Sequence, residues 1–151
     1  MRLTSLNSYL FTILNNFGLL FEIWLTYLIV DFRVSNTSFN RWRSWLDCDR
    51  AKLQNALSEQ AIRQIIELSE KVGRNHYKKM NCLRRSLTQK LLLEKRGVSS
   101  ELKLGVRLEN SNLAAHAWLV CGEICLNDTA ENIKSYQVLD LGDMSLKPLL
   151  S

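Results

Sequence analysis

The spacing of apolar residues changes along the chain from a helical period to a period of two. Over residues 53–72 apolar side chains recur every three or four positions, which predicts a helix with one buried face. They are Leu53, Leu57, Ala61, Ile65, Leu68 and Val72. Gly73 follows directly and suits a left-handed C-terminal cap. A second stripe at Leu83, Leu87 and Leu91 predicts a helix that begins near Cys82 and stops at Gly97.

Alternation of apolar and polar residues begins at residue 101. Residues 101–108 alternate strictly, which predicts a strand with one buried face. Residues 113–121 are apolar on both faces apart from His116, as expected of a central strand. Two shorter strands are predicted over 124–126 and 135–139. Helices followed by an antiparallel sheet define an α+β fold, with a helix packed on a small sheet.

The first third of the chain carries most of the aromatic residues. Ten of the thirteen lie within residues 1–46, and Tyr9–Val30 predicts a helix of 22 residues. At roughly 1.5 Å per residue this helix could cross a bilayer. Glu22 would cost on the order of 2–3 kcal/mol there. We therefore expect a buried or partner-facing helix, with a membrane-surface helix as the less favoured alternative, and a turn over Asn36–Ser38.

The composition is that of a globular protein. The chain has 151 residues, 46% hydrophobic and 23% charged, which suits one compact unit. We divide it into an aromatic helical segment, 1–46, and a core, 47–151. Four cysteines are too sparse for a disulfide scaffold, and the apolar N-terminal stretch has no cleavage site of a signal peptide. The expected location is the reducing cytoplasm.

The net charge of +5 is concentrated in one stretch. Nine basic residues lie between Lys71 and Arg96 against a single acid, Glu94. Such a stripe attracts nucleic acid, a lipid surface or an acidic peptide. A solvated helix face is the simpler interpretation. A non-catalytic basic binding module or scaffold is therefore the alternative to an enzyme.

Three side chains could form a nucleophilic site. Cys82 opens a predicted helix, and a helix N-terminus with a nearby imidazolium lowers a thiol pKa from about 8.5. His116 is the polar residue of an apolar strand, and Asp128 could orient its ring. Asn127 could replace Asp128 in that role. His76, with no acid or thiol near it in sequence, is expected at the surface.

The loop between the second and third strands decides whether His116 and Asp128 can be neighbours within the sheet. A three-residue loop, Cys121–Glu123, pairs them on one face with Cβ atoms roughly 4.5–5.5 Å apart. A two-residue loop, Gly122-Glu123, pairs Ala117 with Asp128 and sends the side chains to opposite faces. Local turn preference slightly favours the shorter loop. The catalytic hypothesis therefore depends on the longer one.

Four short motifs occur in order before the acid. A Cys-Leu pair opens the helix, which ends Leu-Leu-x-x-x-Gly; a Leu-Gly-Val strand and Ala-His-Ala-Trp follow. They are Cys82-Leu83, Leu92–Gly97, Leu104–Val106 and Ala115–Trp118. His116 lies 34 residues after Cys82, and Asp128 lies 12 after His116. Over about residues 75–140 this pattern resembles the transglutaminase-like leader peptidases of lasso-peptide biosynthesis.

The resemblance implies a cysteine peptidase that removes the leader from a ribosomally made precursor peptide. Cys82 would be the nucleophile, His116 the base and later the acid, and Asp128 the residue that orients His116. Neither a cofactor nor nucleic acid is implied. A separate leader-recognition protein would be needed, and the aromatic N-terminal helices could bind it. A separate ATP-dependent macrolactam synthetase would take the freed core.

Other residues near the predicted site suggest further roles. Cys121 and Cys125 could hold zinc together with His116 or Cys48, but one C-x3-C spacing lacks the paired spacings of zinc sites. We expect no metal, and buried thiols that pack as small apolar groups. Trp118 is expected to pack in the core beside the site. The backbone N–H of Cys82 is the expected oxyanion donor.

Overall fold

The fold is a set of helices followed by a small antiparallel sheet, as predicted. The computed structural model describes residues 3–46 and 57–139, with side chains from residue 17 onward. The helices are α1 (Leu3–Asn36), α2 (Phe39–Trp42), the short 3-10 helix η1 (Arg43–Trp45), α3 (Glu59–Arg74), α4 (Cys82–Glu94) and α5 (Ala130–Ile133). The strands are β1 (Glu101–Glu109), β2 (Asn112–Cys121), β3 (Ile124–Cys125) and β4 (Gln137–Val138), in the order β3-β2-β1-β4.

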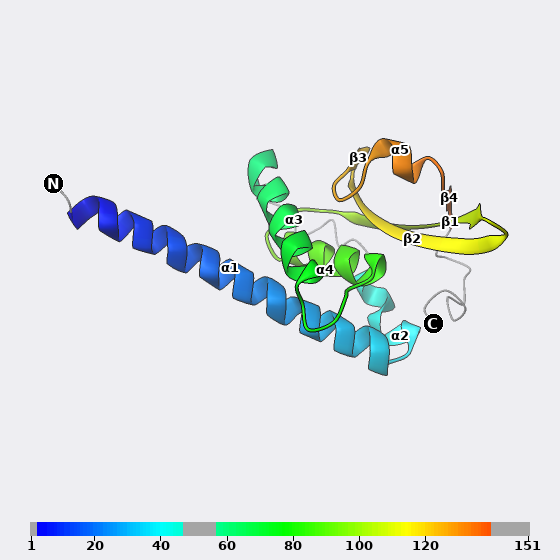
Figure 1. Ribbon diagram of the computed structural model, residues 1–151, viewed down its shortest axis with the longest axis horizontal. Helices are drawn as coiled ribbons and strands as arrows, with labels where there is room; N and C mark the ends of the chain where they lie inside the picture. Colours follow the sequence, from blue (N-terminus) through cyan, green and yellow to red (C-terminus); the bar gives the residue numbers. More distant parts are fainter. Residues whose placement is uncertain (1–2, 47–56, 140–151) are drawn as a thin grey trace.

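Helix α4 occupies the centre of the molecule. It contacts α1 and α3 as well as β1 and β2, and Figure 1 shows it between the helices and the curled sheet. Asn81 caps its first turn by accepting a hydrogen bond from the Arg84 N–H at 3.0 Å. Leu87 and Leu93 are completely buried, and even Lys90 is enclosed, with its ammonium against Glu94. The predicted start of this helix near Cys82 is confirmed.

Helix α1 is longer than the predicted Tyr9–Val30, and its two sides differ. Ile23, Tyr27 and Val30 are buried against α3 and α4. Its N-terminal half extends beyond the other elements (Figure 1). The opposite side carries exposed apolar side chains, namely Phe17, Phe21, Trp24, Leu25, Ile29 and Phe32. Within the described residues, no helix is long and apolar enough to span a membrane.

Three expectations about the region before α4 were wrong. The helix predicted over residues 53–72 starts later, because Ser58 caps α3 and Leu57 lies before it. Gly73 is not a left-handed cap, because α3 continues to Arg74; a Cβ on Gly73 would lie 2.5 Å from the Tyr27 hydroxyl oxygen. Glycine is needed there for close packing of α3 on α1. His76 is not at the surface, since it is 8% exposed and its ring packs against Trp24 and Tyr27.

A buried carboxylate joins α1 to the segment that leads into α4. Asp31 is 4% exposed. Its carboxylate accepts hydrogen bonds from Arg84 Nε at 2.6 Å and from the Tyr77 hydroxyl, and it pairs with Lys78 Nζ at 2.7 Å. Burial alone would raise the pKa of Asp31, but these three donors hold it far below its usual value. The first turn of α4 is thereby fixed against α1.

Candidate active site

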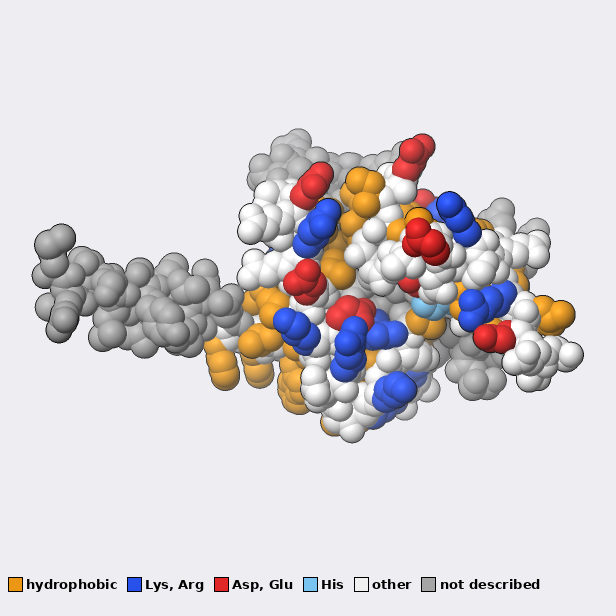
Figure 2. All heavy atoms as spheres, turned by 45° about the horizontal axis from the view of Figure 1, so that its top comes forward, with side chains coloured by type: hydrophobic (Ala, Val, Ile, Leu, Met, Phe, Trp, Pro, Cys, Tyr) orange, Lys and Arg blue, Asp and Glu red, His pale blue; other side chains and the backbone are white. Residues whose placement is uncertain are grey.

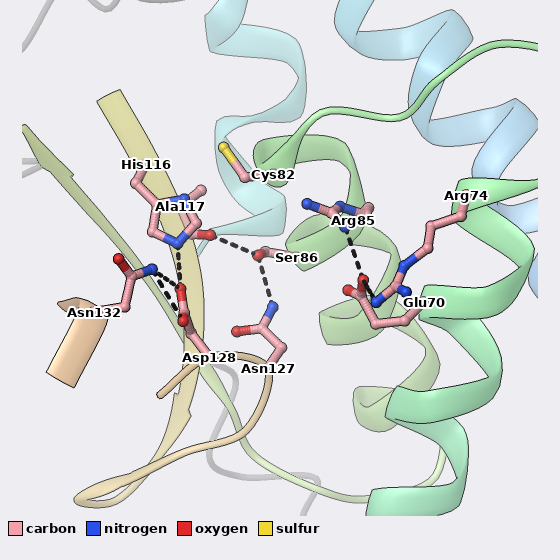
Figure 3. A pocket seen from close by; sticks show the side chains of 10 residues that line it. All are labelled: Glu70, Arg74, Cys82, Arg85, Ser86, His116, Ala117, Asn127, Asp128 and Asn132. Carbon is pink, nitrogen blue, oxygen red and sulfur yellow. Dashed lines mark hydrogen bonds and ion pairs between the residues drawn. The ribbon is translucent and has the colours of Figure 1, made fainter. Parts of the chain in front are cut away.

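Cys82 lines a cavity of about 300 Å³ that lies between the start of α4, helix α3 and the sheet (Figure 3). Its position as the first residue of α4 follows from the Asn81 cap. The thiol is half-buried and belongs to no disulfide. The cavity is lined by Glu70, Arg74, Cys82, Arg85, Ser86, His116, Ala117, Asn127, Asp128 and Asn132.

His116 is held beside the thiol by the sheet. In β2 it pairs with Gly105 of β1, and the missing side chain there leaves room for two rings. His116 stacks on Trp118 with 5.9 Å between the ring centroids, and the tilted ring of Tyr136 contacts it at 5.1 Å. Trp118 is 3% exposed, as expected of a core residue beside the site. The imidazole plane is therefore fixed by packing on both neighbouring rings.

His116 contacts Asp128 although the three-residue loop that would pair these two residues within the sheet is absent. The register pairs Cys121 with Ile124 and Val120 with Cys125, so the loop is the two-residue Gly122-Glu123. Gly122 has a φ of 60°, which its position in this turn requires. The expectation that the His116–Asp128 contact requires a three-residue loop was therefore wrong. Even so, His116 Nε2 lies 2.5 Å from an Asp128 carboxylate oxygen.

His116 and Asp128 can make this contact because the chain leaves the hydrogen-bonded ladder with β2 before it reaches Asp128. The Leu126 N–H still donates to the Leu119 carbonyl at 2.8 Å. The Leu119 N–H then donates to the side-chain oxygen of Asn127 at 2.9 Å. Beyond this point the alternation of strand faces no longer dictates where a side chain points, and Asp128 turns back toward β2.

Asn127 connects α4 to the sheet, whereas Asp128 contacts the His116 ring. Its side-chain nitrogen donates to Ser86 Oγ at 2.9 Å and to Gln89 Oε1 at 2.6 Å, while its oxygen accepts from β2. These contacts tie α4 to the sheet. The Asn127 amide therefore contacts α4 and β2, whereas the Asp128 carboxylate contacts the His116 ring. Of the two alternatives left open by the sequence, Asp128 is the one against the imidazole.

The three groups shift one another's protonation. Burial alone would raise the pKa of the Cys82 thiol, but the His116 imidazole and the backbone N–H groups of Ala117 and Leu83 lower it below its usual value. Hydrogen bonding to Cys82 is the main cause that raises the pKa of His116; burial opposes this and Asp128 adds to it. Asp128 occupies Nε2, which leaves Nδ1 as the ring nitrogen available to the thiol. The arrangement favours a thiolate–imidazolium pair.

Charged residues form the opposite wall of the cavity. Glu70 of α3 accepts from Arg85 Nη1 and from Gln89 Nε2, both at 2.8 Å, and Arg74 lies 3.9 Å away (Figure 3). Arg85 stands one turn after Cys82 on α4. A substrate in the cavity would therefore meet the reactive pair on one side and these charges on the other.

Most of the basic stripe is paired inside the molecule. Seven of its nine cations form ion pairs with acidic side chains. They are Arg74, Lys78, Arg84, Arg85, Lys90, Lys95 and Arg96. On the face of the molecule that Figure 2 draws, Lys and Arg side chains are interspersed with Asp and Glu. Arg74 and Lys90 pair with acids four residues away on their own helices, Glu70 and Glu94. The other five cations pair with acids of α1 and α3 that are distant in sequence.

Cys121 and Cys125, the two described cysteines outside the cavity, lie on opposite faces of the sheet. In the register of β2 and β3, Cys121 is opposite Ile124, so Cys125 points to the other face. Among the residues that the structure describes, no three metal-ligating side chains cluster. Both thiols are half-buried rather than fully buried. Cys48 lies outside the described residues.

Sequence reasoning missed two residues at the site. Asn132 donates to both carboxylate oxygens of Asp128, and Tyr136 packs on His116. Thr129 and Asn132 have the spacing of an N-cap and its partner, and the Thr129 hydroxyl does accept from the Asn132 N–H. That signal predicts a helix start and gives no sign that the amide reaches the acid.

The chain matches a known protein family. The model of the transglutaminase-like superfamily matches residues 26–140. No curated protein and no solved structure gives a significant match. The match spans more than half of the chain and contains α4, the whole sheet and the three residues Cys82, His116 and Asp128. This chain belongs to the transglutaminase-like superfamily.

Proposed function

We propose that this chain is a cysteine peptidase that cleaves the leader from a lasso-peptide precursor. The observation that carries the proposal is the Cys82–His116–Asp128 arrangement in a cavity of a transglutaminase-like domain. The superfamily supports the coarser assignment to cysteine chemistry. The substrate class comes from the motif pattern around these residues, which resembles the lasso leader peptidases.

The reaction would run through a thioester. The Cys82 thiolate attacks the carbonyl carbon at the leader–core junction, and the carbonyl oxygen takes up the negative charge. His116 donates its proton to the departing amine of the core as the C–N bond breaks. The same imidazole then takes a proton from water, which attacks the thioester and releases the leader as a carboxylic acid. Asp128 stabilises the imidazolium throughout.

The oxyanion would be held at the start of α4. In an α-helix the first N–H groups have no partner within the helix, and their dipole favours negative charge. The Cys82 N–H is such a group, since it precedes the first capped N–H, that of Arg84. An oxyanion that forms beside the Cys82 sulfur could then accept a hydrogen bond from this N–H, which already has its position in the free protein.

Two separate proteins would complete the pathway. A leader-recognition protein would present the precursor, and an ATP-dependent macrolactam synthetase would close the ring on the freed core amine. The exposed apolar side of α1 is our candidate for the surface that the leader-recognition protein binds. Phe17 and Phe32, at its two described ends, are 70% and 66% exposed. Apolar patches of this kind mark interaction surfaces.

The test is cleavage of a lasso-peptide precursor, with and without a leader-recognition protein. Cys82→Ala should abolish cleavage and leave the melting temperature within a few degrees. Cys125→Ala is the matched control, because that thiol lies outside the cavity, and it should cleave at the wild-type rate. Cleavage by the Cys82 variant would contradict the proposal. Neighbouring reading frames for a precursor and an asparagine-synthetase-like cyclase would support it.

A non-catalytic basic module makes opposite predictions. Its affinity for an anionic partner should fall steeply with salt and should not change in Cys82→Ala. The internal pairing of seven cations in the stripe leaves less positive charge for such a partner. Selective alkylation of Cys82 at neutral pH would count against this alternative.

A further inference from the structure

The Asp128 carboxylate receives more hydrogen bonds than the imidazole alone supplies. Asn132 Nδ2 lies 2.9 Å from the oxygen that also faces His116, and 3.1 Å from the other oxygen. The Thr129 N–H donates to that other oxygen at 2.7 Å. A side-chain amide nitrogen carries two N–H groups, so Asn132 can contact both oxygens at once. Figure 3 shows Asn132 beside Asp128, on the side away from Asn127.

Asn132 is itself fixed to the sheet. Its backbone N–H donates to the Thr129 hydroxyl at 3.3 Å, and its carbonyl accepts from the Ser135 hydroxyl at 2.7 Å. Ser135 Oγ in turn accepts from Arg107 Nη1 of β1 at 3.1 Å. A four-residue helix such as α5 is not stable alone. These contacts give the Asn132 amide a defined position relative to His116.

Asp128 needs such support because it lies beyond the strand ladder. Backbone pairing with β2 ends at Leu126, so Asp128 has no strand partner that would set its direction. The terminal torsion of a carboxylate is also broad. The Asp128 oxygen that faces His116 contacts two groups, the imidazole and the Asn132 amide. The imidazole cannot fix the carboxylate, because its own orientation depends on that carboxylate.

We propose that Asn132 is a positioning residue that holds the Asp128 carboxylate in the orientation in which it fixes the His116 imidazole. This inference rests on the proposed function, because it assigns Asn132 a role in forming the Cys82–His116 pair. Asn132 contacts the acid and acts through it. Its loss should therefore change the reactivity of Cys82 without loss of the fold.

The experiment follows the alkylation rate of Cys82 by iodoacetamide from pH 4 to pH 10. Peptide mapping by mass spectrometry separates Cys82 from the other thiols. The variants are Asn132→Ala, which removes the amide, and Asn132→Asp, which keeps the shape but replaces the donor by a second carboxylate. Glu131→Gln, an exposed change in the same short helix, is the control.

Both Asn132 variants should shift the acid side of the profile to higher pH, because a poorly oriented imidazolium stabilises the thiolate less. The shift should be larger for Asn132→Asp, where two carboxylates share one site. Cleavage of the precursor should fall about ten- to a hundredfold in kcat with little change in KM, the range for one lost hydrogen bond to a charged group. Glu131→Gln should match the wild type.

Unchanged profiles in both folded variants would overturn the inference, as would a lower melting temperature with an unchanged profile. If Asn132→Asp fails to fold, Asn132→Ala decides alone. A wild-type Cys82 no more reactive than free cysteine would contradict the proposed function, and the inference with it. A reactive wild type with unchanged variants contradicts the inference alone.

Discussion

His116 and Asp128 are joined through the ring nitrogen that faces away from Cys82. His116 Nε2 lies 2.5 Å from Asp128 Oδ2, and the side chains are 20% and 15% exposed. Nδ1 is then the nitrogen that can exchange a proton with the thiol. The carboxylate, the imidazole and the sulfur form one chain of contacts. A change at any of the three groups should therefore alter the reactivity of the Cys82 thiol.

The pH dependence of activity should be bell-shaped and displaced on both sides. The pKa of Cys82 is lowered, so the thiolate forms below the usual thiol range near about 8.5. The pKa of His116 is raised, so the imidazolium persists above its usual value of about 6.5. We expect kcat/KM to be highest between these two limits. Initial rates across pH measure it, and a single rise centred near pH 8.5 would contradict a preformed ion pair.

Replacement of Asp128 by Asn should impair catalysis without a change of shape. The neutral amide removes the charge that helps to raise the pKa of His116. We expect kcat to fall by about 10²–10⁴-fold, the range for loss of the orienting acid in comparable sites. Single-turnover cleavage measures the effect. Glu123→Gln, an exposed change in the turn between β2 and β3, is the control. Equal rates for Asp128→Asn and wild type would remove Asp128 from the mechanism.

Asp31→Asn should destabilise the fold in a pH-dependent way. The change leaves Arg84 and Lys78 without their carboxylate, at a cost of about 2–3 kcal/mol in the free energy of unfolding at neutral pH. The pKa of Asp31 is lower in the folded protein, so its contribution is present above the unfolded value of about 3.9 and is lost as the pH falls toward the folded pKa. The difference between variant and wild type should therefore shrink in acid.

Urea unfolding at pH 7 and pH 3 measures this difference. Glu67→Gln, an exposed change on α3, should have almost no effect at either pH. A constant difference between Asp31→Asn and wild type at both pH values would show that the loss comes from packing rather than from charge.

Gly105→Ala should damage both stability and the site. A Cβ at this position would lie 2.8 Å from the Trp118 ring and 2.9 Å from the Tyr136 Cβ. Overpacking of this kind costs about 1–3 kcal/mol. Both rings support His116, so cleavage should slow as well. Gly18→Ala is the control, because nothing lies within 4 Å of that Cβ and alanine favours a helix by about 1 kcal/mol. Thermal unfolding and alkylation of Cys82 give the two readouts, and a Gly105 variant as stable and reactive as wild type would contradict this account.

The local patterns of the chain were sufficient for α4, β1 and β2 and for the placement of the nucleophile, whereas α5 was not predicted. The apolar stripe at Leu83 and Leu87, preceded by Asn81, determines where α4 begins, because a cap and a buried face are encoded within a few residues. Alternation after residue 101 likewise determines the sheet. The turn preference of Gly122-Glu123 determined a two-residue loop, whereas the catalytic hypothesis required a loop of three residues.

Only the tertiary structure decided how the distant residues meet. The contact of His116 with Asp128, the support from Asn132 and the burial of His76 all join segments that no period relates. The pairing of the basic stripe depends on acids of α1 and α3, such as Asp31 and Glu70. The physical reason is the range of each signal. Periodicity and caps act over a few residues, whereas these contacts depend on how whole faces pack and on where the chain leaves the ladder.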